Sequence, residues 1–209
     1  MKRYSFPHSG SALALPLASR RRFVQGLAAA LSGAGLPVHR TAEPSGGPVG
    51  RLLRELLRSL EVPDTAVYAL LFAADRRHHW LTEILPRLEQ GTWVVTDRYV
   101  LSSLAYQGGG GPLGEETAWV SNLNARAPLP VVTFFLDLPF EVAQARLQAR
   151  GGVRENLEDA EFQEKVALRY RELARTFGGS LVTLDATQAP QHLVRAAVRE
   201  LAVRGILPG

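Results

Sequence analysis

The sequence predicts an α/β fold, a doubly wound parallel sheet of five strands flanked by helices, in a single domain over residues 1–209. Segments with strand-like and helix-like patterns alternate along the chain, as they do in sheets whose strands are connected through helices. Residues 131–137 are almost continuously apolar before a terminal aspartate, which is typical of a parallel strand buried on both faces. Because 46% of the residues are hydrophobic and 21% are charged, the composition also fits a globular domain.

The first half of the chain is expected to hold two strands and three helices. A short strand is expected over residues 3–6. Apolar spacing then predicts a helix over residues 19–34, with a serine as its N-cap and a glycine as its stop. A strand candidate over residues 36–41 leads into a turn rich in glycine and proline. Helical spacing of apolar residues returns over residues 49–60 and 64–89.

Strand propensity is strongest after residue 90. Residues 92–97 combine β-branched and aromatic side chains before a charged end, and this predicts a strand like the one over residues 131–137. A run of glycines precedes a helix expected over residues 114–126. The other expected elements are helices over residues 139–150, 159–177 and 190–204 and a strand over residues 180–185.

The composition excludes several kinds of site. The chain has no cysteine, so disulfides, thiolate metal sites and a cysteine nucleophile are excluded. The net charge of +4 permits an anionic ligand, and all but two of the 24 basic residues are arginine. These arginines are dispersed and no basic run exceeds three residues, so nucleic acid is not the expected partner. A DNA affinity that falls steeply with salt would favour it.

No segment is expected to enter a membrane. The longest apolar runs are shorter than the roughly 20 residues that a spanning helix needs. Basic residues at the start and an apolar run over residues 12–18 resemble a short export signal, but the run contains Pro16 and leads into Arg20–Arg22. The expected location is therefore the cytoplasm.

Aspartate closes three of the predicted strands, at Asp97, Asp137 and Asp185. Ligands of parallel sheets bind beyond the carboxyl ends of the strands, so these carboxylates are site candidates. Asp97 is followed by Arg98, and such a pair offers a carboxylate for magnesium or its waters and a guanidinium for a phosphate. A structural ion pair at the end of the strand would use the same residue types.

Two further segments carry side chains suited to a base and its phosphate. Phe72 and Arg76 lie one helical turn apart, so an aromatic ring that can stack on a base lies beside a guanidinium. Core packing is the alternative role of Phe72. Hydroxyl and amide groups that share about one helical face follow the strand over residues 92–97, and they belong to Ser102, Ser103, Tyr106 and Gln107.

These motifs, in this order and at this spacing, resemble the thymidylate kinase family across residues 22–205. The segments that carry the resemblance are Thr41–Pro44, Leu71–Arg76, Asp97–Tyr99, Ala105–Gly108, Phe135–Pro139 and Leu184–Thr187. The resemblance implies a P-loop-kinase-like fold and an enzyme that phosphorylates dTMP with ATP and Mg2+. It also implies a homodimer, for which apolar helices over residues 49–89 could supply the interface.

The resemblance further implies roles in a dTMP pocket. Phe72 is similar to the residue that stacks on thymine, and Gln107 to the residue that faces the thymine edge. Arg76 and Arg98 resemble the ligands of the dTMP phosphate. The other expected pocket residues are Glu43, Ser102, Ser103 and Tyr106.

On the side of ATP, the resemblance implies a mobile lid over about residues 147–158. Arg150 and Arg154 join Asp97 and Arg98 as candidate catalytic residues, since arginines on a closing loop suit phosphoryl transfer. Asp97 is also the candidate residue near magnesium. Val153 stands where the family's lid usually has aspartate. The candidate ATP-binding residues are Arg20, Arg146, Asp185, Ala186 and Thr187.

The phosphate-binding loop of the family, G-x-x-x-x-G-K-[ST], does not occur in the sequence. The two lysines, Lys2 and Lys165, lie at the terminus and in a late helix, so neither can be the loop lysine. No acidic residue precedes Glu43, and Ala42 replaces the arginine usual before Glu-Pro.

Three explanations stay open. In the first, another anion site replaces the loop: family spacing places the loop lysine near Arg20, and His8–Ser11 could add a hydroxyl-rich turn. Solvent exposure is nevertheless the expected state of Arg20–Arg22. In the second, the protein binds a thymidine nucleotide but transfers phosphate poorly or not at all, as a binding or regulatory module. In the third, the first roughly 20 residues are not the native N-terminus, through a misassigned start or a reading-frame error.

Overall fold

The computed structural model describes residues 7–10, 17–59, 64–109, 114–148 and 160–207. Its strands are β1 (Pro7–Gly10), β2 (Val38–Ala42), β3 (Trp93–Asp97), β4 (Val132–Asp137) and β5 (Leu181–Asp185). They form one parallel sheet of five strands in the order β2-β3-β1-β4-β5. The α/β class predicted from the sequence is therefore confirmed.

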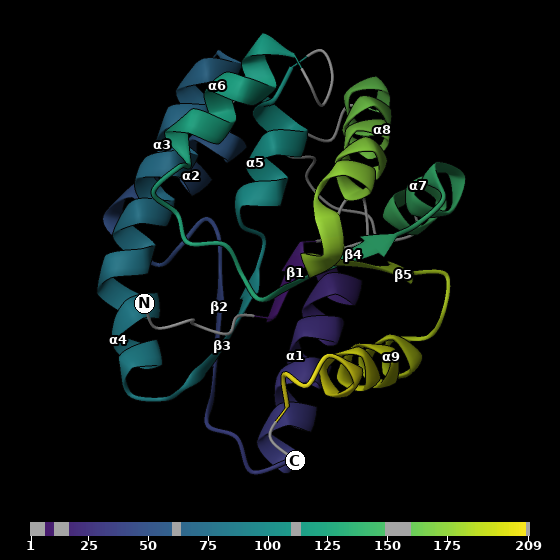
Figure 1. Ribbon diagram of the computed structural model, residues 1–209. Helices are drawn as coiled ribbons and strands as arrows, with labels where there is room; N and C mark the ends of the chain where they lie inside the picture. Colours follow the sequence, from purple (N-terminus) through teal and green to yellow (C-terminus); the bar gives the residue numbers. More distant parts are fainter. Residues whose placement is uncertain (1–6, 11–16, 60–63, 110–113, 149–159, 208–209) are drawn as a thin grey trace.

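Helices cover both faces of this sheet (Figure 1). In chain order they are α1 (Leu17–Gly33), α2 (Pro48–Arg58), α3 (Thr65–His79), the π turn η1 (Trp80–Ile84), α4 (Leu85–Glu89), α5 (Val100–Gln107), α6 (Glu115–Leu123), α7 (Phe140–Gln148), α8 (Ala160–Thr176), the 3-10 turn η2 (Gly178–Ser180) and α9 (Pro190–Val203). Helices α1, α7 and α9 pack on one face, and α3, α5, α6 and α8 pack on the other. None of the described helices is long and apolar enough to cross a membrane.

Successive residues of the central strands point into opposite cores, as the apolar run of β4 predicts. Phe134 and Leu136 lie in the core with α1 and α9, whereas Phe135 lies in the core with α5 and α8. In β3, Val95 lies in the core with α1 and α9, and Val94 lies in the core with α5 and α8. Because both faces are covered, polar side chains that must reach a ligand gather at the carboxyl edge of the sheet.

The first strand lies at Pro7–Gly10, whereas the strand expected at residues 3–6 lies outside the described residues. The sequence of β1 is a poor strand signal, because proline has no N–H and glycine has no side chain to pack. Pairing with both β3 and β4 nevertheless fixes it in the middle of the sheet. His8–Gly10 therefore belong to a strand and do not form the expected turn.

The helix predicted over residues 64–89 changes its hydrogen bonding in the middle, where the π turn η1 separates α3 from α4. Pro86 has no N–H to donate to the preceding turn, and the N–H of Leu85 instead reaches the carbonyl of Trp80, five residues back. The π turn carries Glu83, whose carboxylate lies 2.8 Å from Nε2 of His39.

The register brings the functional segments to one level of the carboxyl edge. Ala42 of β2 and Ser9 of β1 both pair with Asp97 of β3. The N–H of Glu43 donates to the carbonyl of Asp97 at 2.9 Å, so the loops after β2 and β3 start side by side. The connection from β1 to α1, residues 11–16, lies outside the described residues, and its sequence contains neither glycine nor lysine.

We expect Phe134→Ala to lower the free energy of unfolding by about 3–5 kcal/mol, because a buried aromatic ring is replaced by a cavity. Phe134 is 0% exposed and meets Phe23 of α1 edge to face, with ring centres 6.1 Å apart. Urea unfolding followed by circular dichroism measures the loss. The control Leu129→Ala removes a side chain that is 60% exposed and should change stability by less than about 0.5 kcal/mol. Equal losses for the two variants would contradict the described core.

Candidate functional site

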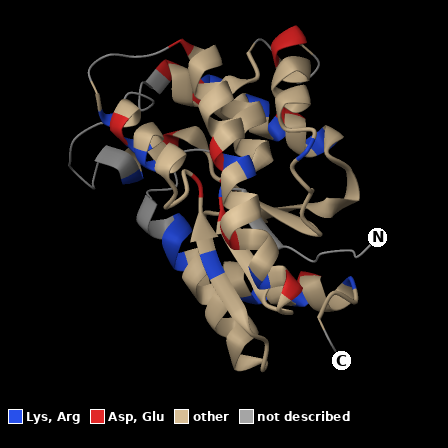
Figure 2. Cartoon of the chain, turned by 90° about the vertical axis from the view of Figure 1, so that its left-hand side faces the viewer, with Lys and Arg blue, Asp and Glu red and all other residues tan. Residues whose placement is uncertain are grey.

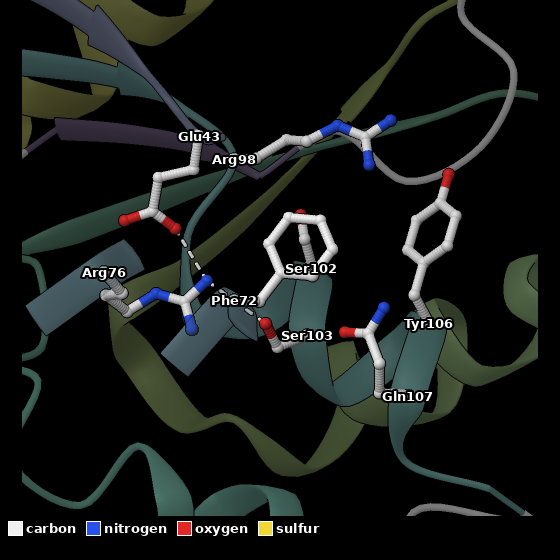
Figure 3. A pocket seen from close by; sticks show the side chains of 8 residues that line it. All are labelled: Glu43, Phe72, Arg76, Arg98, Ser102, Ser103, Tyr106 and Gln107. Atoms are coloured by element: carbon white, nitrogen blue, oxygen red, sulfur yellow. Dashed lines mark hydrogen bonds and ion pairs between the residues drawn. The ribbon is translucent and has the colours of Figure 1, made fainter. Parts of the chain in front are cut away.

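A pocket opens at the carboxyl edge of the sheet, with walls from the loop after β2, from α3, from the turn after β3 and from α5 (Figure 3). Its lining residues are Glu43, Phe72, Arg76, Arg98, Ser102, Ser103, Tyr106 and Gln107. These are the same residues that the sequence predicts for the substrate pocket. The fold therefore brings together three segments that are far apart in the sequence, because the turn after β3 runs directly into α5.

Arg98 is the cation of the pocket that is available to a ligand. Its backbone φ of +70° is left-handed, which costs a non-glycine residue about 1–2 kcal/mol, and it turns the chain from β3 into α5. The half-buried guanidinium lies 5.0 Å from the ring centre of Tyr106, and none of the ion pairs among the described residues involves it. Burial alone lowers the pKa of Arg98, but electrostatic interactions with Tyr106, Tyr170 and Asp97 raise it above its ordinary value. The side chain is therefore charged.

Arg76, the second guanidinium of the pocket, is 2% exposed and is already engaged by protein groups. One terminal nitrogen donates to Glu43 at 2.6 Å and to Ser103 at 3.1 Å, and the other donates to Asn124. Its guanidinium carbon lies 5.1 Å from the ring centre of Tyr99. Its Nε is buried and has no hydrogen-bond partner among the described residues. Arg76 thus braces the pocket through Glu43, and Nε is the donor left for a ligand.

Glu43 is buried and is held from a second side by histidine. Nδ1 of His79 lies 3.4 Å from its carboxylate, and Nε2 of His79 lies 2.7 Å from the hydroxyl of Thr41. The loop after Glu43 is fixed by Asp75, which accepts hydrogen bonds from the N–H of Ser45 at 2.7 Å and from its hydroxyl at 2.6 Å. The position of Glu43 is therefore set before any ligand binds.

Charges and burial behind the pocket shift the pKa values of two further groups, Glu83 and Tyr99. Burial raises the pKa of Glu83, but hydrogen bonds with His39 and Thr41 and the nearby His79 lower it below its ordinary value. Burial, together with the charge of Glu43, raises the pKa of the Tyr99 phenol. Glu83 is therefore ionised at neutral pH while the phenol is neutral.

The opposite part of the pocket is neutral. The ring of Phe72 enters from α3 and the amide of Gln107 enters from α5 (Figure 3). Oε1 of Gln107 is buried without a hydrogen-bond partner among the described residues, a state that costs about 1–3 kcal/mol. Ser102 accepts a hydrogen bond of 2.8 Å from the hydroxyl of Tyr170. A flat ring, an unsatisfied amide and a cation together suit a planar heterocycle that carries an anion.

Asp97, the last residue of β3, is paired with Arg20 of α1. Nε of Arg20 lies 2.6 Å from Oδ1 and donates to Oδ2 at 2.8 Å, and each side chain is 9% exposed. The expectation that Arg20 is solvent exposed is therefore wrong, because the first turn of α1 faces the end of β3. Arg21 and Arg22 are exposed, as expected.

The surroundings of Asp97 do not fit a magnesium ion. Oδ2 accepts a hydrogen bond of 2.8 Å from Nε of Arg20, and the same nitrogen lies 2.6 Å from Oδ1, so a fixed cation already lies against the carboxylate. Oδ1 is buried and accepts no hydrogen bond from the described residues. In the described ranges, no group of three or more His, Cys, Asp or Glu residues is arranged to hold a metal. The prediction that Asp97 organises magnesium thus disagrees with this geometry. A structural ion pair is present, with Arg20 as its partner.

The other two strand-end aspartates contact neighbouring protein groups. Oδ1 of Asp137 lies 3.0 Å from Nε of Arg171 in α8. Asp185 accepts hydrogen bonds from the hydroxyl of Thr187 at 2.7 Å and from its N–H at 3.0 Å, and these bonds lower the pKa of Asp185. Neither carboxylate reaches the pocket described above.

The residues predicted for the ATP side are brought together in part. Arg146 of α7 donates to the carbonyl of Ala186 at 3.1 Å, so it reaches the predicted loop over Asp185–Thr187. Arg20 lies elsewhere, beside Asp97. Arg150 and Arg154 of the predicted lid lie outside the described residues.

Sequence reasoning missed the residues that hold the pocket from behind. Asn124 contacts Arg76 across 48 residues, and Tyr170 contacts Ser102 across 68, so no local pattern connects them. The position of His79 could have been inferred from the sequence, because it lies one helical turn after Arg76 and therefore on the same face of α3.

Comparisons with known proteins agree on one family. The family profile for thymidylate kinase matches residues 22–197. A probable thymidylate kinase of Pyrobaculum aerophilum is 41% identical over 167 residues, which cover 80% of this chain and 83% of the relative. The thymidylate kinase of Leuconostoc citreum is 40% identical over 71% of this chain and 72% of the relative. That of Lacticaseibacillus casei is 35% identical over 81% of this chain and 82% of the relative. The profile match starts inside α1, after Arg20.

We expect His79→Ala to lower the free energy of unfolding by about 1–3 kcal/mol, since buried partners of the imidazole lose a hydrogen bond. His79 is 1% exposed between Glu43 and Thr41. Urea unfolding measures the effect. The control is His192→Ala, which changes an exposed histidine of α9, and a change under about 0.5 kcal/mol is expected for it. Unchanged stability of His79→Ala would show that the network does not support the pocket.

Proposed function

The chain belongs to the thymidylate kinase family, and we propose that it phosphorylates dTMP to dTDP with ATP as the phosphoryl donor. Enzymes of this family use ATP with Mg2+. The observation that supports the proposal most is the pocket at the carboxyl edge, where residues from three separate segments converge. Its ring, amide and arginine match the base and the phosphate of a thymidine nucleotide.

On the acceptor side, we place thymine against the ring of Phe72 and beside the amide of Gln107. The buried Oε1 of Gln107 accepts the N–H of thymine, which removes the cost of an unsatisfied oxygen. Arg98 binds the phosphate through its planar fork of donors. Nε of Arg76 adds a further donor, while its terminal nitrogens keep Glu43 in place.

In the transfer step, an oxygen of the dTMP phosphate attacks the γ-phosphorus of ATP, the bond from that phosphorus to the β,γ-bridging oxygen breaks, and ADP leaves. The protein contributes position and charge. Arg98 holds the acceptor, and Arg150 and Arg154 neutralise charge on the transferred group. Arg146, with the loop over Asp185–Thr187, holds the adenine.

A second function, nucleotide binding without transfer, is favoured by two observations. The sequence lacks the G-x-x-x-x-G-K-[ST] motif, and Asp97 is paired with Arg20. Calorimetric titration with dTMP and with Mg-ATP, followed by a coupled assay of ADP release, separates the two functions. Binding of both with turnover supports the kinase. Binding of dTMP without ATP affinity or turnover supports a binding module.

We expect Arg98→Ala to weaken dTMP binding by about 100-fold, because a charge-assisted bidentate contact in a buried site is lost. Isothermal titration calorimetry measures the dissociation constant. Arg175→Ala removes an exposed arginine from α8 and serves as the control with unchanged affinity. Wild-type affinity in Arg98→Ala would refute the assignment of the pocket.

The proposed enzyme is a homodimer. Helices α2, α3 and α6 form one flank of the molecule (Figure 1), and exposed apolar side chains lie there, among them Leu52, Val67, Leu70 and Trp119. Figure 2 faces this flank and shows basic and acidic residues interspersed, without one large basic patch. This distribution favours a protein partner of the same kind over nucleic acid.

We expect Leu70→Arg to convert the dimer to a monomer, because a charge is placed on an apolar surface that is buried on association. Leu70 is 50% exposed on α3. The control Leu168→Arg changes a leucine that is 53% exposed on α8, away from this flank. Size-exclusion chromatography with light scattering gives the mass, and a wild-type monomer would contradict the proposal.

A further inference from the structure

We infer that Arg20 is a resident cation for Asp97, in the place where a divalent ion is expected, and that the pocket therefore binds its nucleotide without a divalent ion. The second part rests on the proposed dTMP pocket. The first part depends on the geometry of Arg20 and Asp97.

The geometry gives Asp97 its counter-charge from within the chain. A buried carboxylate needs a partner, and Arg20 supplies one at 2.6 and 2.8 Å while both side chains are 9% exposed. An arginine cannot give up this role by losing its proton, because the guanidinium is always charged in proteins. A metal ion would have to displace a fixed cation from a site closed to solvent.

The pair lies at the edge of the pocket. Asp97 directly precedes Arg98, and its carbonyl accepts the N–H of Glu43 at 2.9 Å, so it stands between two lining residues. A free negative charge on Asp97 would repel a phosphate held by Arg98. Neutralisation by Arg20 removes that repulsion, and a phosphate can then bind without magnesium.

The first experiment is calorimetric titration with dTMP, in EDTA and in magnesium chloride, of the wild type, Arg20→Ala and the double variant Arg20→Ala/Asp97→Asn. We expect the wild-type dissociation constant to change by less than about twofold with magnesium. Arg20→Ala should bind at least about tenfold more weakly in EDTA, the size of one charged interaction, and magnesium should restore part of the loss. The double variant should recover affinity without magnesium, because the unpaired negative charge is gone.

The matched control is Arg204→Ala. Its Nε lies 2.6 Å from Glu200, like Nε of Arg20 from Asp97, but this pair lies at the end of α9, where the two side chains are 31% and 33% exposed. This variant should bind dTMP as the wild type does under both conditions. Thermal unfolding by circular dichroism checks that each variant is folded, and Arg20→Lys, which keeps the positive charge, should retain binding in EDTA.

Three outcomes would overturn the inference. The dTMP affinity of the wild type could depend strongly on magnesium, Arg20→Ala could bind dTMP as tightly as the wild type in EDTA, or the double variant could bind dTMP as weakly as Arg20→Ala. A second readout does not depend on dTMP. Electron paramagnetic resonance of added Mn2+ should show equal binding to the wild type and to Asp97→Asn, and a site lost in Asp97→Asn would overturn the inference. If the wild type does not bind dTMP at all, the proposed function fails, while the Mn2+ comparison still decides the role of Arg20.

Discussion

Buried charge at the carboxyl edge of the sheet is the constraint on which the site depends. Glu43 and Asp97 are 4% and 7% exposed, and buried carboxylates are stable when each has a partner of opposite charge. Arg76 reaches Glu43 from α3, and Arg20 reaches Asp97 from α1. Because loss of one partner from such a pair costs about 3–5 kcal/mol, the pairs tie the two helices to the edge of the sheet.

This pairing also decides which cation is left for a ligand. Arg76 and Arg20 are directed at protein carboxylates, whereas Arg98 has no such partner among the described residues. Its left-handed backbone, unfavourable in isolation, places the guanidinium over Tyr106 and toward the pocket. Strain of this kind persists where the surroundings fix it, and here the end of β3 and the start of α5 do so.

Most of the fold could be predicted from local patterns. The apolar run of β4 indicated burial on both faces. The residues that line the pocket were expected from short motifs at strand ends and on one helical face, together with the resemblance to the thymidylate kinase family. Contacts between distant segments could not be predicted. Asn124 and Tyr170 reach the pocket across 48 and 68 residues, and β1 is held by its neighbours rather than by strand propensity.

The charge of Arg20 shows the limit of sequence reasoning most clearly. Three arginines in the first turn of a helix oppose its dipole, and on that basis exposure to solvent was expected for all of them. In the folded chain Arg21 and Arg22 are exposed, but Arg20 meets Asp97 across 77 residues, and the ion pair offsets the cost of burying both charges. The sequence names both residues, but it does not show that folding brings their side chains together.

The two halves of the proposed reaction depend on different parts of the chain. The proposed acceptor pocket is built from residues between β2 and α6, all within the region that matches the family profile. The proposed donor side depends on the segment before residue 22 and on the predicted lid, and the first of these lacks the G-x-x-x-x-G-K-[ST] motif of a phosphate-binding loop. Phosphoryl transfer needs both substrates positioned, whereas binding of a monophosphate needs the acceptor side alone. In the proposed function, nucleotide binding and catalysis therefore depend on separable parts of the chain.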